Sequence, residues 1–357
     1  MLGYCRRPLA RLDYSQKLIS LLGLIMRNIF KTLAVVVVLT AGPAWSRAGL
    51  SSLHDQDPTD FLVAILRADG TLLPFAQYGN GGFYNPWPKP LPCPGCTDET
   101  YPHSLGGLPR PWFVQGGKMP PRWYFRSSNG ALTILRGLKI AEAENHSQKN
   151  WVLQTDFPHD YVERSHHLNL GVAVTAQTKI DRMTESKPEP GGLPSFIKEL
   201  FDADETTKIE KLATDDPTVT ASLFKFGLPE SAAKRNQVEV TTKFYRSESP
   251  INGEYLYYFE ARKEYELPRS SSSGHVSLFS GWASVETRAG GQMGLILSEV
   301  VFTDTDMKGP TTSRPLGILK LGGRTFIFVE EHGWEDESYV ILELNGGIHR
   351  LLETFGG

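Results

Sequence analysis

Glycine-containing turns between apolar runs constrain the fold of this chain more than any other sequence feature. The pattern occurs at Asp69-Gly70, Asn129-Gly130, Gly322-Gly323 and Asn345-Gly346-Gly347. Each turn separates two segments rich in β-branched, aromatic and aliphatic residues, which is typical of a β-hairpin. The sequence therefore predicts a mainly β protein built from hairpins.

Further strand-like runs lie between these hairpins, and one of them shows clear alternation. In "VEVTTKFY" the residues Val238, Val240 and Thr242 share one face, and polar residues occupy the other, as a half-buried strand requires. We predict sandwich-like or irregular barrel lobes. A β-propeller is the alternative architecture, although the hairpins and tryptophans recur at no fixed period.

A change in composition near Glu185 predicts a helical connector between two β-rich regions. The break "SKPEPGGLP" precedes "SFIKELFDADETTKIEKLA", in which Phe196, Leu200 and Phe201 have helical spacing and Ser195 is the expected N-cap. We predict an N-terminal β-rich region (49–185) containing a long Pro/aromatic loop (78–113), a partly helical connector (186–236) and a C-terminal β-rich region (237–357).

The first 48 residues predict export. Residues 26–48 combine basic Arg27 and Lys31, an apolar run through Leu39 and small residues at Ala44 and Ser46, which is the pattern of a secretory signal. Because the apolar core spans about ten residues and a membrane helix needs about 20, we expect no permanent membrane anchor. Residues 1–25 are expected not to be translated or retained, and the protein is expected to be periplasmic or extracellular.

The charge of the chain argues against nucleic-acid partners. Removing residues 1–46 leaves 31 basic and 39 acidic side chains, a net charge of −8. The remaining chain has no basic run, so it lacks the electrostatic footprint that nucleic acids or anionic membranes require.

The motif "CPGC" places Cys93 and Cys96 on a proline-rich loop. Covalent haem attachment is excluded because Thr97 stands where histidine is required. An exported protein favours a disulfide between the two cysteines. A zinc site completed by Asp98 and His103 and a redox-active dithiol are the alternatives.

The loop around these cysteines is the first candidate binding site. It is rich in proline, which holds the chain extended, and in aromatic residues, which argue against disorder. Tyr84, Trp87 and Trp112 are the candidate ligand contacts, because aromatic faces stack on sugar rings or peptides. The alternative is that these rings pack onto the sheet and anchor the loop.

Clusters of carboxylates and histidines offer weaker candidates for metal binding or catalysis. They are His159, Asp160, His166 and His167; Asp304 and Asp306; and, in "EEHGWEDES", Glu330, Glu331, His332, Trp334, Glu335, Asp336 and Glu337. The last cluster contains enough carboxylates for the acid and base of a glycosidase. We interpret the histidines as surface residues near a strand start, the two aspartates as an acidic turn after a strand, and the last cluster as a solvated loop between two apolar runs. We expect no metal and no cofactor.

Neither remaining motif defines a catalytic site. The run Ser270–Ser273 lies near His275, but the chain has no G-x-S-x-G sequence. Asn145-His146-Ser147 is a glycosylation sequon, which matters only in a eukaryotic secretory pathway.

Taken together, these patterns predict an exported, soluble, non-catalytic binding or cell-envelope-associated protein whose ligand is unknown and is expected to be a carbohydrate or a peptide. One alternative is a secreted, possibly glycan-directed hydrolase that uses a carboxylate pair. The second is a thiol-disulfide protein acting through Cys93 and Cys96.

Overall fold

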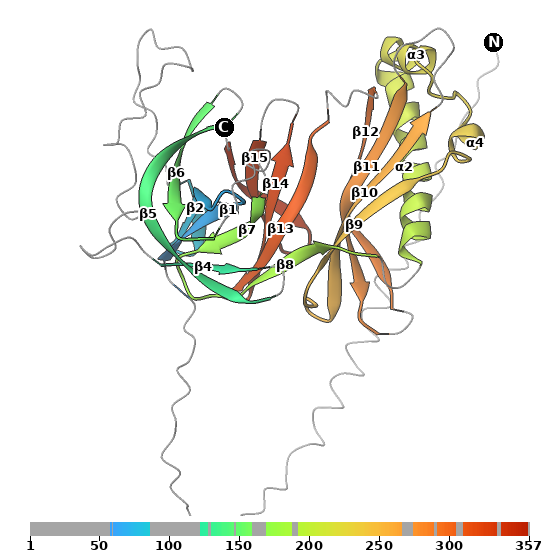
Figure 1. The fold of residues 1–357 in the computed structure, drawn as a ribbon. Helices are drawn as coiled ribbons and strands as arrows, with labels where there is room; N and C mark the ends of the chain where they lie inside the picture. Colours follow the sequence, from blue (N-terminus) through green and yellow to red (C-terminus); the bar gives the residue numbers. More distant parts are fainter. Residues whose placement is uncertain are drawn as a thin grey trace, which may run out of the picture. The chain divides into compact units, whose positions relative to one another are not determined.

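The computed structural model describes most of the chain beyond residue 57. The described ranges are 58, 60–85, 122–127, 130–145, 148–158, 169–187, 192–265, 274–288, 291–304, 310–333 and 337–355, with 139–145, 148–151, 304 and 355 described by backbone only. Residues 56–357 form one compact unit. It is mainly β, as the sequence predicts (Figure 1).

Six strands of the first sheet close into a barrel. The order is β1-β7-β4-β5-β6-β2-β3, and β1 also pairs with β2, so that β3 is appended to the closed ring. The strands are β1 (Asp60–Arg67), β2 (Thr71–Gly79), β3 (Gly82–Tyr84), β4 (Arg122–Arg126), β5 (Leu132–Asn145), β6 (Gln148–Thr155) and β7 (Asn169–Val174). Leu66, Trp123 and Phe125 belong to the apolar cluster of these strands.

The second sheet has nine strands in the order β12-β11-β10-β9-β8-β13-β14-β15-β16. Its strands are β8 (Ile180–Glu185), β9 (Thr241–Ser247), β10 (Glu254–Tyr265), β11 (His275–Glu286), β12 (Met293–Asp304), β13 (Thr312–Leu321), β14 (Arg324–His332), β15 (Glu337–Leu344) and β16 (Ile348–Phe355). Strand β8 directly follows the barrel in sequence and lies between β9 and β13. The sheets and the barrel match the predicted irregular barrel lobes, and the described strands form no radial blades of a propeller.

All four predicted hairpins are present. They are β1–β2, β4–β5, β13–β14 and β15–β16. Gly70, Gly130, Gly322, Gly323 and Gly346 all have positive φ. A residue with a β-carbon rarely adopts this conformation, which explains why glycine marks each turn.

The helices fall within the predicted connector. They are α2 (Leu193–Asp215), α3 (Pro217–Lys225) and α4 (Ala232–Arg235). The expectation that Ser195 caps α2 is wrong, because the helix starts earlier: Gly192 is its N-cap and a proline lies in its first turn, where no N–H is needed. One buried stripe of α2 packs on β10, β11 and β12; it contains Leu193, Ile197, Phe201, Glu205 and Ile209.

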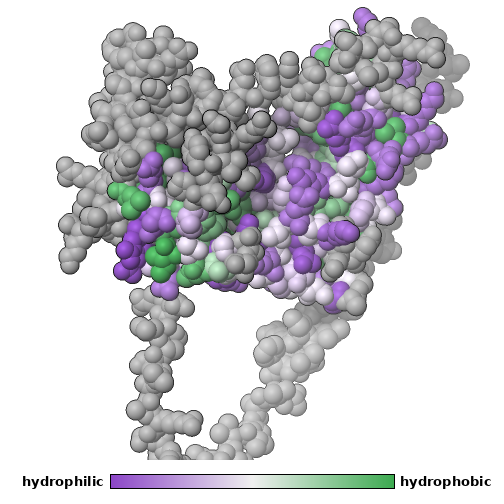
Figure 2. All heavy atoms as spheres, viewed as in Figure 1, coloured by the Kyte–Doolittle hydropathy of each residue, from purple (hydrophilic) through white to green (hydrophobic). Residues whose placement is uncertain are grey.

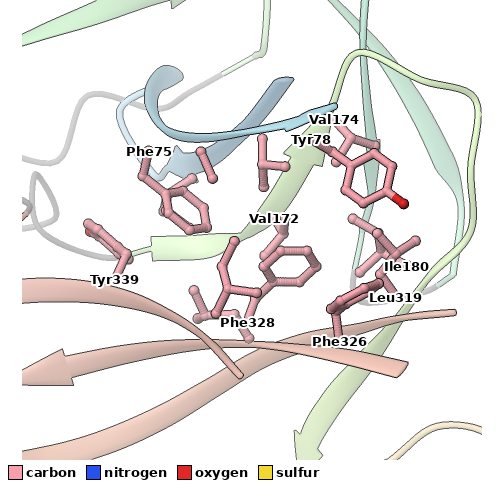
Figure 3. Close-up of a cluster of buried hydrophobic side chains, with 14 of the residues drawn as sticks. Phe75, Tyr78, Val172, Val174, Ile180, Leu319, Phe326, Phe328 and Tyr339 are labelled. Atoms are coloured by element: carbon pink, nitrogen blue, oxygen red, sulfur yellow. The ribbon is translucent and has the colours of Figure 1, made fainter. Parts of the chain in front are cut away.

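A continuous apolar core joins the outside of the barrel to the second sheet. Figure 3 shows Phe75 and Val172 of the barrel facing Phe328 and Tyr339 across this junction. The rings of Phe75 and Phe328 meet edge to face with centroids 6.2 Å apart. Complete burial of such a side chain contributes about 1.5–3 kcal/mol, so this junction is a major source of stability.

On the face that Figure 2 shows, the described residues are mostly hydrophilic or intermediate in hydropathy. The hydrophobic groups on this face are gathered on the barrel. Strand β5 exposes Leu132, Ile134 and Leu138 on one face. No described helix is both long and apolar enough to span a membrane.

Candidate functional site

Many of the predicted site residues lie outside the described part of the chain. They are Trp87, Cys93, Cys96, Asp98, His103, Trp112, His159, Asp160, His166, His167, Ser270–Ser273, Asp306, Trp334, Glu335 and Asp336. Asn145 and Asp304 end β5 and β12, and only their backbones are described. The predicted disulfide, the thiol hypothesis and the tryptophan contacts therefore stay predictions, as does the division into regions.

Tyr84 and His275 both lie in the described part of the chain, on β3 and β11. Tyr84 is 43% exposed on β3. Burial and the charge of Asp60 raise the pKa of its hydroxyl. His275 is buried in β11, with ring centroids 6.0 and 5.9 Å from those of Tyr265 and Phe302, so it belongs to the core.

The "EEHGWEDES" stretch differs from its predicted role. Glu330 and Glu337 are buried, with exposed fractions of 0% and 5%, so their interpretation as parts of a solvated loop is wrong. Strand alternation explains the difference, because Glu330 and His332 share one face of β14. The register pairs Glu330 with Tyr339 and His332 with Glu337. These four polar side chains therefore lie on one face of the β14–β15 hairpin.

The barrel supplies a fifth polar residue from the opposite side. Asn169 is the first residue of β7 and pairs with Arg67, and a bulge separates this pair from Leu66 and Gly171. At the bulge, Leu170 packs with the barrel cluster, and the Asn169 side chain reaches the second sheet. The bulge therefore determines which face of β7 these residues occupy. A local irregularity thus directs a polar residue into the junction.

These residues form one group linked by hydrogen bonds and charges, which we call the polar centre; its members are Asn169, Arg314, Glu330, His332, Glu337 and Tyr339, and Arg67, which interacts electrostatically with Glu330 and Glu337. Asn169 Nδ2 donates to Glu330 Oε1 at 2.5 Å, to Glu337 Oε1 at 3.0 Å and to Tyr339 OH at 2.9 Å. The Tyr339 hydroxyl also donates to Glu337. One amide nitrogen therefore sits among three oxygen atoms.

Two groups contact Glu330 from different directions. Arg314 Nε donates to Oε2 at 2.7 Å, and its Nη2 donates to the Asn169 carbonyl at 3.1 Å. His332 Nε2 lies 2.9 Å from Oε1 and its side chain is 43% exposed. The polar centre is therefore buried on the carboxylate side and reaches solvent through the imidazole.

The local charges shift several pKa values. Burial alone raises the pKa of Glu330, but the hydrogen bond from His332 and the charge of Arg314 outweigh it and lower the pKa. The hydrogen bond to Glu330 raises the pKa of His332. Burial lowers the pKa of Arg67, against the opposing charges of Glu337, Asp69 and Glu330.

The polar centre has two buried polar atoms that lack a hydrogen-bond partner among the described residues. They are Asn169 Oδ1 and Arg67 Nε, in side chains that are 5% and 3% exposed. Most buried polar groups in proteins are paired, so such atoms need an explanation. In addition, Glu330, His332 and Glu337 each offer a ligand atom, and these atoms lie within 4.8 Å of one another.

Sequence patterns point to only part of this group. Glu330, His332 and Glu337 form a charged cluster in the sequence. Asn169, Arg314 and Tyr339 lie in apolar or mixed strands with no motif, and Asn169 is 161 residues from Glu330. The only local signal is the alternation of Glu330 with His332 and of Glu337 with Tyr339.

Two other features lie elsewhere. Under α2, Lys263 forms ion pairs of 2.7 Å with both Glu205 and Asp202. A surface pocket of about 490 Å³ lies between the start of α2 and β9, lined by Glu185, Ser186, Lys187, Pro194, Thr242, Lys243 and Phe244. It contains no residue of the polar centre, and its charged rim offers no convergent catalytic geometry.

The fold and the polar centre define a mainly β protein in which a closed barrel packs on a nine-stranded sheet. Comparisons of the chain with protein-family models, curated protein sequences and solved structures found no match.

Proposed function

We propose that this protein is an exported, non-catalytic binding protein whose ligand is held at the polar centre. The observation that carries the proposal is the unpaired Asn169 Oδ1 beside Glu330, His332 and Glu337, whose ligand atoms lie within 4.8 Å of one another. A purely structural network is most stable when every buried atom has a partner. An unpaired acceptor beside two buried carboxylates indicates a place for another bonded species.

The pairing of Glu330 argues against this residue as the general acid of a hydrolase. A glycosidase needs one carboxyl that stays protonated as the general acid. Arg314 and His332 instead lower the pKa of Glu330, which keeps this group ionised. Export remains part of the proposal because residues 26–48 have the pattern of a secretory signal.

A hydrolase is the second candidate, supported by one specific observation. The ligand atoms of Glu330 and Glu337 lie within 4.8 Å of each other, close to the separation of about 5–5.5 Å between the two carboxyl groups of retaining glycosidases. In this alternative, Glu337 is the group that must supply the acid, because Glu330 is held ionised.

Tyr84 belongs to a separate candidate surface. It pairs with Gln77, which in turn faces Leu62. Arg67 is five residues further along β1, which corresponds to about 17 Å of strand. The aromatic-loop hypothesis and the polar centre therefore require separate tests.

Native mass spectrometry of the full chain, purified from the extracytoplasmic fraction of its host, tests the proposal. We expect an additional bound mass on the wild-type protein and its loss in Glu337→Gln. The matched control is Glu331→Gln, because Glu331 is adjacent to Glu330 and pairs with Arg350 instead. Absence of any bound mass, together with turnover of chromogenic glycosides that Glu337→Gln abolishes, would establish the hydrolase in its place.

A further inference from the structure

Within this proposed function, the geometry points to one class of ligand: we infer that Glu330, His332 and Glu337 bind a divalent first-row transition-metal ion, with Asn169 as a fourth ligand. The inference deepens the proposed binding function and rests on it. It starts from the three side chains whose ligand atoms lie within 4.8 Å of one another. Zinc–nitrogen and zinc–oxygen bonds of about 2.0–2.2 Å bring such atoms onto one ion after small side-chain movements.

The two oxygens of Glu330 have separate roles in this arrangement. Arg314 contacts Oε2, whereas Oε1 faces Asn169 and His332. An ion at Oε1 therefore leaves the Arg314 hydrogen bond intact. Metal-bound carboxylates are usually held in this way by a second hydrogen bond, which fixes their orientation.

Asn169 provides an independent indication of a cation. Its Oδ1 is buried without a donor among the described residues, while Nδ2 occupies the space between three oxygens. Turning the amide over places Oδ1 among those acceptors. That orientation is repulsive without a cation and favourable with one, so metal binding removes the unpaired acceptor.

Charge balance selects the kind of ion. Arg67 and Arg314 oppose the two carboxylates, so the polar centre has little net negative charge to attract a cation. Ca²⁺ takes 6–8 oxygen ligands and Mg²⁺ prefers oxygen in octahedral geometry. Zn²⁺ forms strong bonds to imidazole and accepts four ligands, so it fits this donor set better. The half-exposed His332 provides the route from solvent.

Equilibrium dialysis of the full chain against Zn²⁺, with the metal content measured by mass spectrometry, tests the inference. The experiment uses a Cys93→Ser, Cys96→Ser background so that thiolates do not contribute. We expect one Zn²⁺ per chain that depends on the polar centre, an affinity at least about 10-fold lower in His332→Asn and in Glu337→Gln, and no comparable binding of Ca²⁺ or Mg²⁺.

Three further variants separate metal binding from a structural network. Glu331→Gln and His349→Asn are controls that leave the affinity for Zn²⁺ unchanged, because neither residue faces the polar centre. Asn169→Asp adds a carboxylate and is expected to bind Zn²⁺ more tightly than the parent, whereas a structural network gains nothing from it.

Equal Zn²⁺ affinity in the parent, His332→Asn and Glu337→Gln would overturn the inference, as would no binding at all. The proposed binding function fails separately. If native mass spectrometry shows an organic ligand that Glu337→Gln loses and dialysis shows no Zn²⁺, the binding function stands and the metal assignment falls.

Discussion

Two buried ionic groups in this protein differ in their access to solvent, although each contains buried polar atoms without a hydrogen-bond partner among the described residues. We call the first the helix cluster; it contains Asp202, Glu205, Arg235, Lys263 and Tyr265. The second is the polar centre. Both place charged side chains against apolar cores, but only the polar centre has a half-exposed imidazole and an unpaired amide oxygen.

The helix cluster has the properties of a structural network. Glu205 is fully buried and accepts hydrogen bonds from Lys263 at 2.7 Å and from Tyr265 at 2.6 Å. Arg235 lies 3.8 Å from the same carboxylate and donates to the carbonyls of Pro229 and Glu230. These contacts join α2, α4 and β10. A network that joins three elements in this way stabilises the fold, although Asp202 Oδ1 and Arg235 Nε also lack a hydrogen-bond partner among the described residues.

The largest effect on stability is expected from Glu205→Ala. The variant leaves Lys263 and Tyr265 buried without their acceptor, and breaking a buried ion pair costs about 3–5 kcal/mol. The free energy of unfolding is measured by urea titration in EDTA. Glu199→Ala, at an exposed position of the same helix, is the control. A loss below about 1 kcal/mol would show that the helix cluster does not stabilise the fold.

Arg314→Met is expected to have a smaller effect on the free energy of unfolding. It removes the hydrogen bonds to Glu330 and to the Asn169 carbonyl. Hydrogen bonds to charged groups contribute about 1.5–3 kcal/mol, and the lower end applies because the Arg314 side chain is 30% exposed. The same titration in EDTA compares both groups without a metal. A loss equal to that of Glu205→Ala would contradict the distinction between them.

The two groups also differ in how far the sequence predicts them. The helix cluster has a local signal, because Glu205 follows Phe201 and precedes Ile209 by four residues on the buried stripe of α2. A charge at that position must be paired. Lys263 similarly continues the alternation of Phe259 and Ala261 on β10, so both partners occupy core positions in their own elements.

The polar centre can be recognised only from the tertiary structure. The hairpin turns and strand alternation are local, so the β class and the four hairpins follow from the sequence. The contact between Asn169 and Glu330 depends on a bulge in β7 and on packing of the barrel against the second sheet. Neither leaves a motif in the sequence, so the sequence alone predicts a solvated loop where the structure has buried carboxylates.

A third acid, Glu260, extends the comparison to the pH dependence of the free energy of unfolding. Its expected effect is the smallest of the three. Glu260 is half-buried on β10 beside the Tyr258 hydroxyl, at 3.3 Å. Burial raises its pKa, although Lys243 of β9 and hydrogen bonds from Tyr258 and Ser313 oppose the shift; Glu185 of β8 raises it slightly. Unlike Glu205, it lacks a buried cation among the described residues.

The direction of the pH effect follows from this raised pKa. The folded state holds the Glu260 proton more tightly than the unfolded state, so the contribution to stability is complete below the unfolded pKa of about 4.3 and is lost as pH rises through the folded pKa. Glu260→Gln cannot ionise. We therefore expect the free energy of unfolding of the wild type to fall relative to this variant between about pH 4 and pH 7. If the difference in free energy of unfolding between the wild type and this variant stays constant across that range, the pKa of Glu260 is the same in the folded and unfolded states. A buried cation would then not be what distinguishes Glu260 from Glu205.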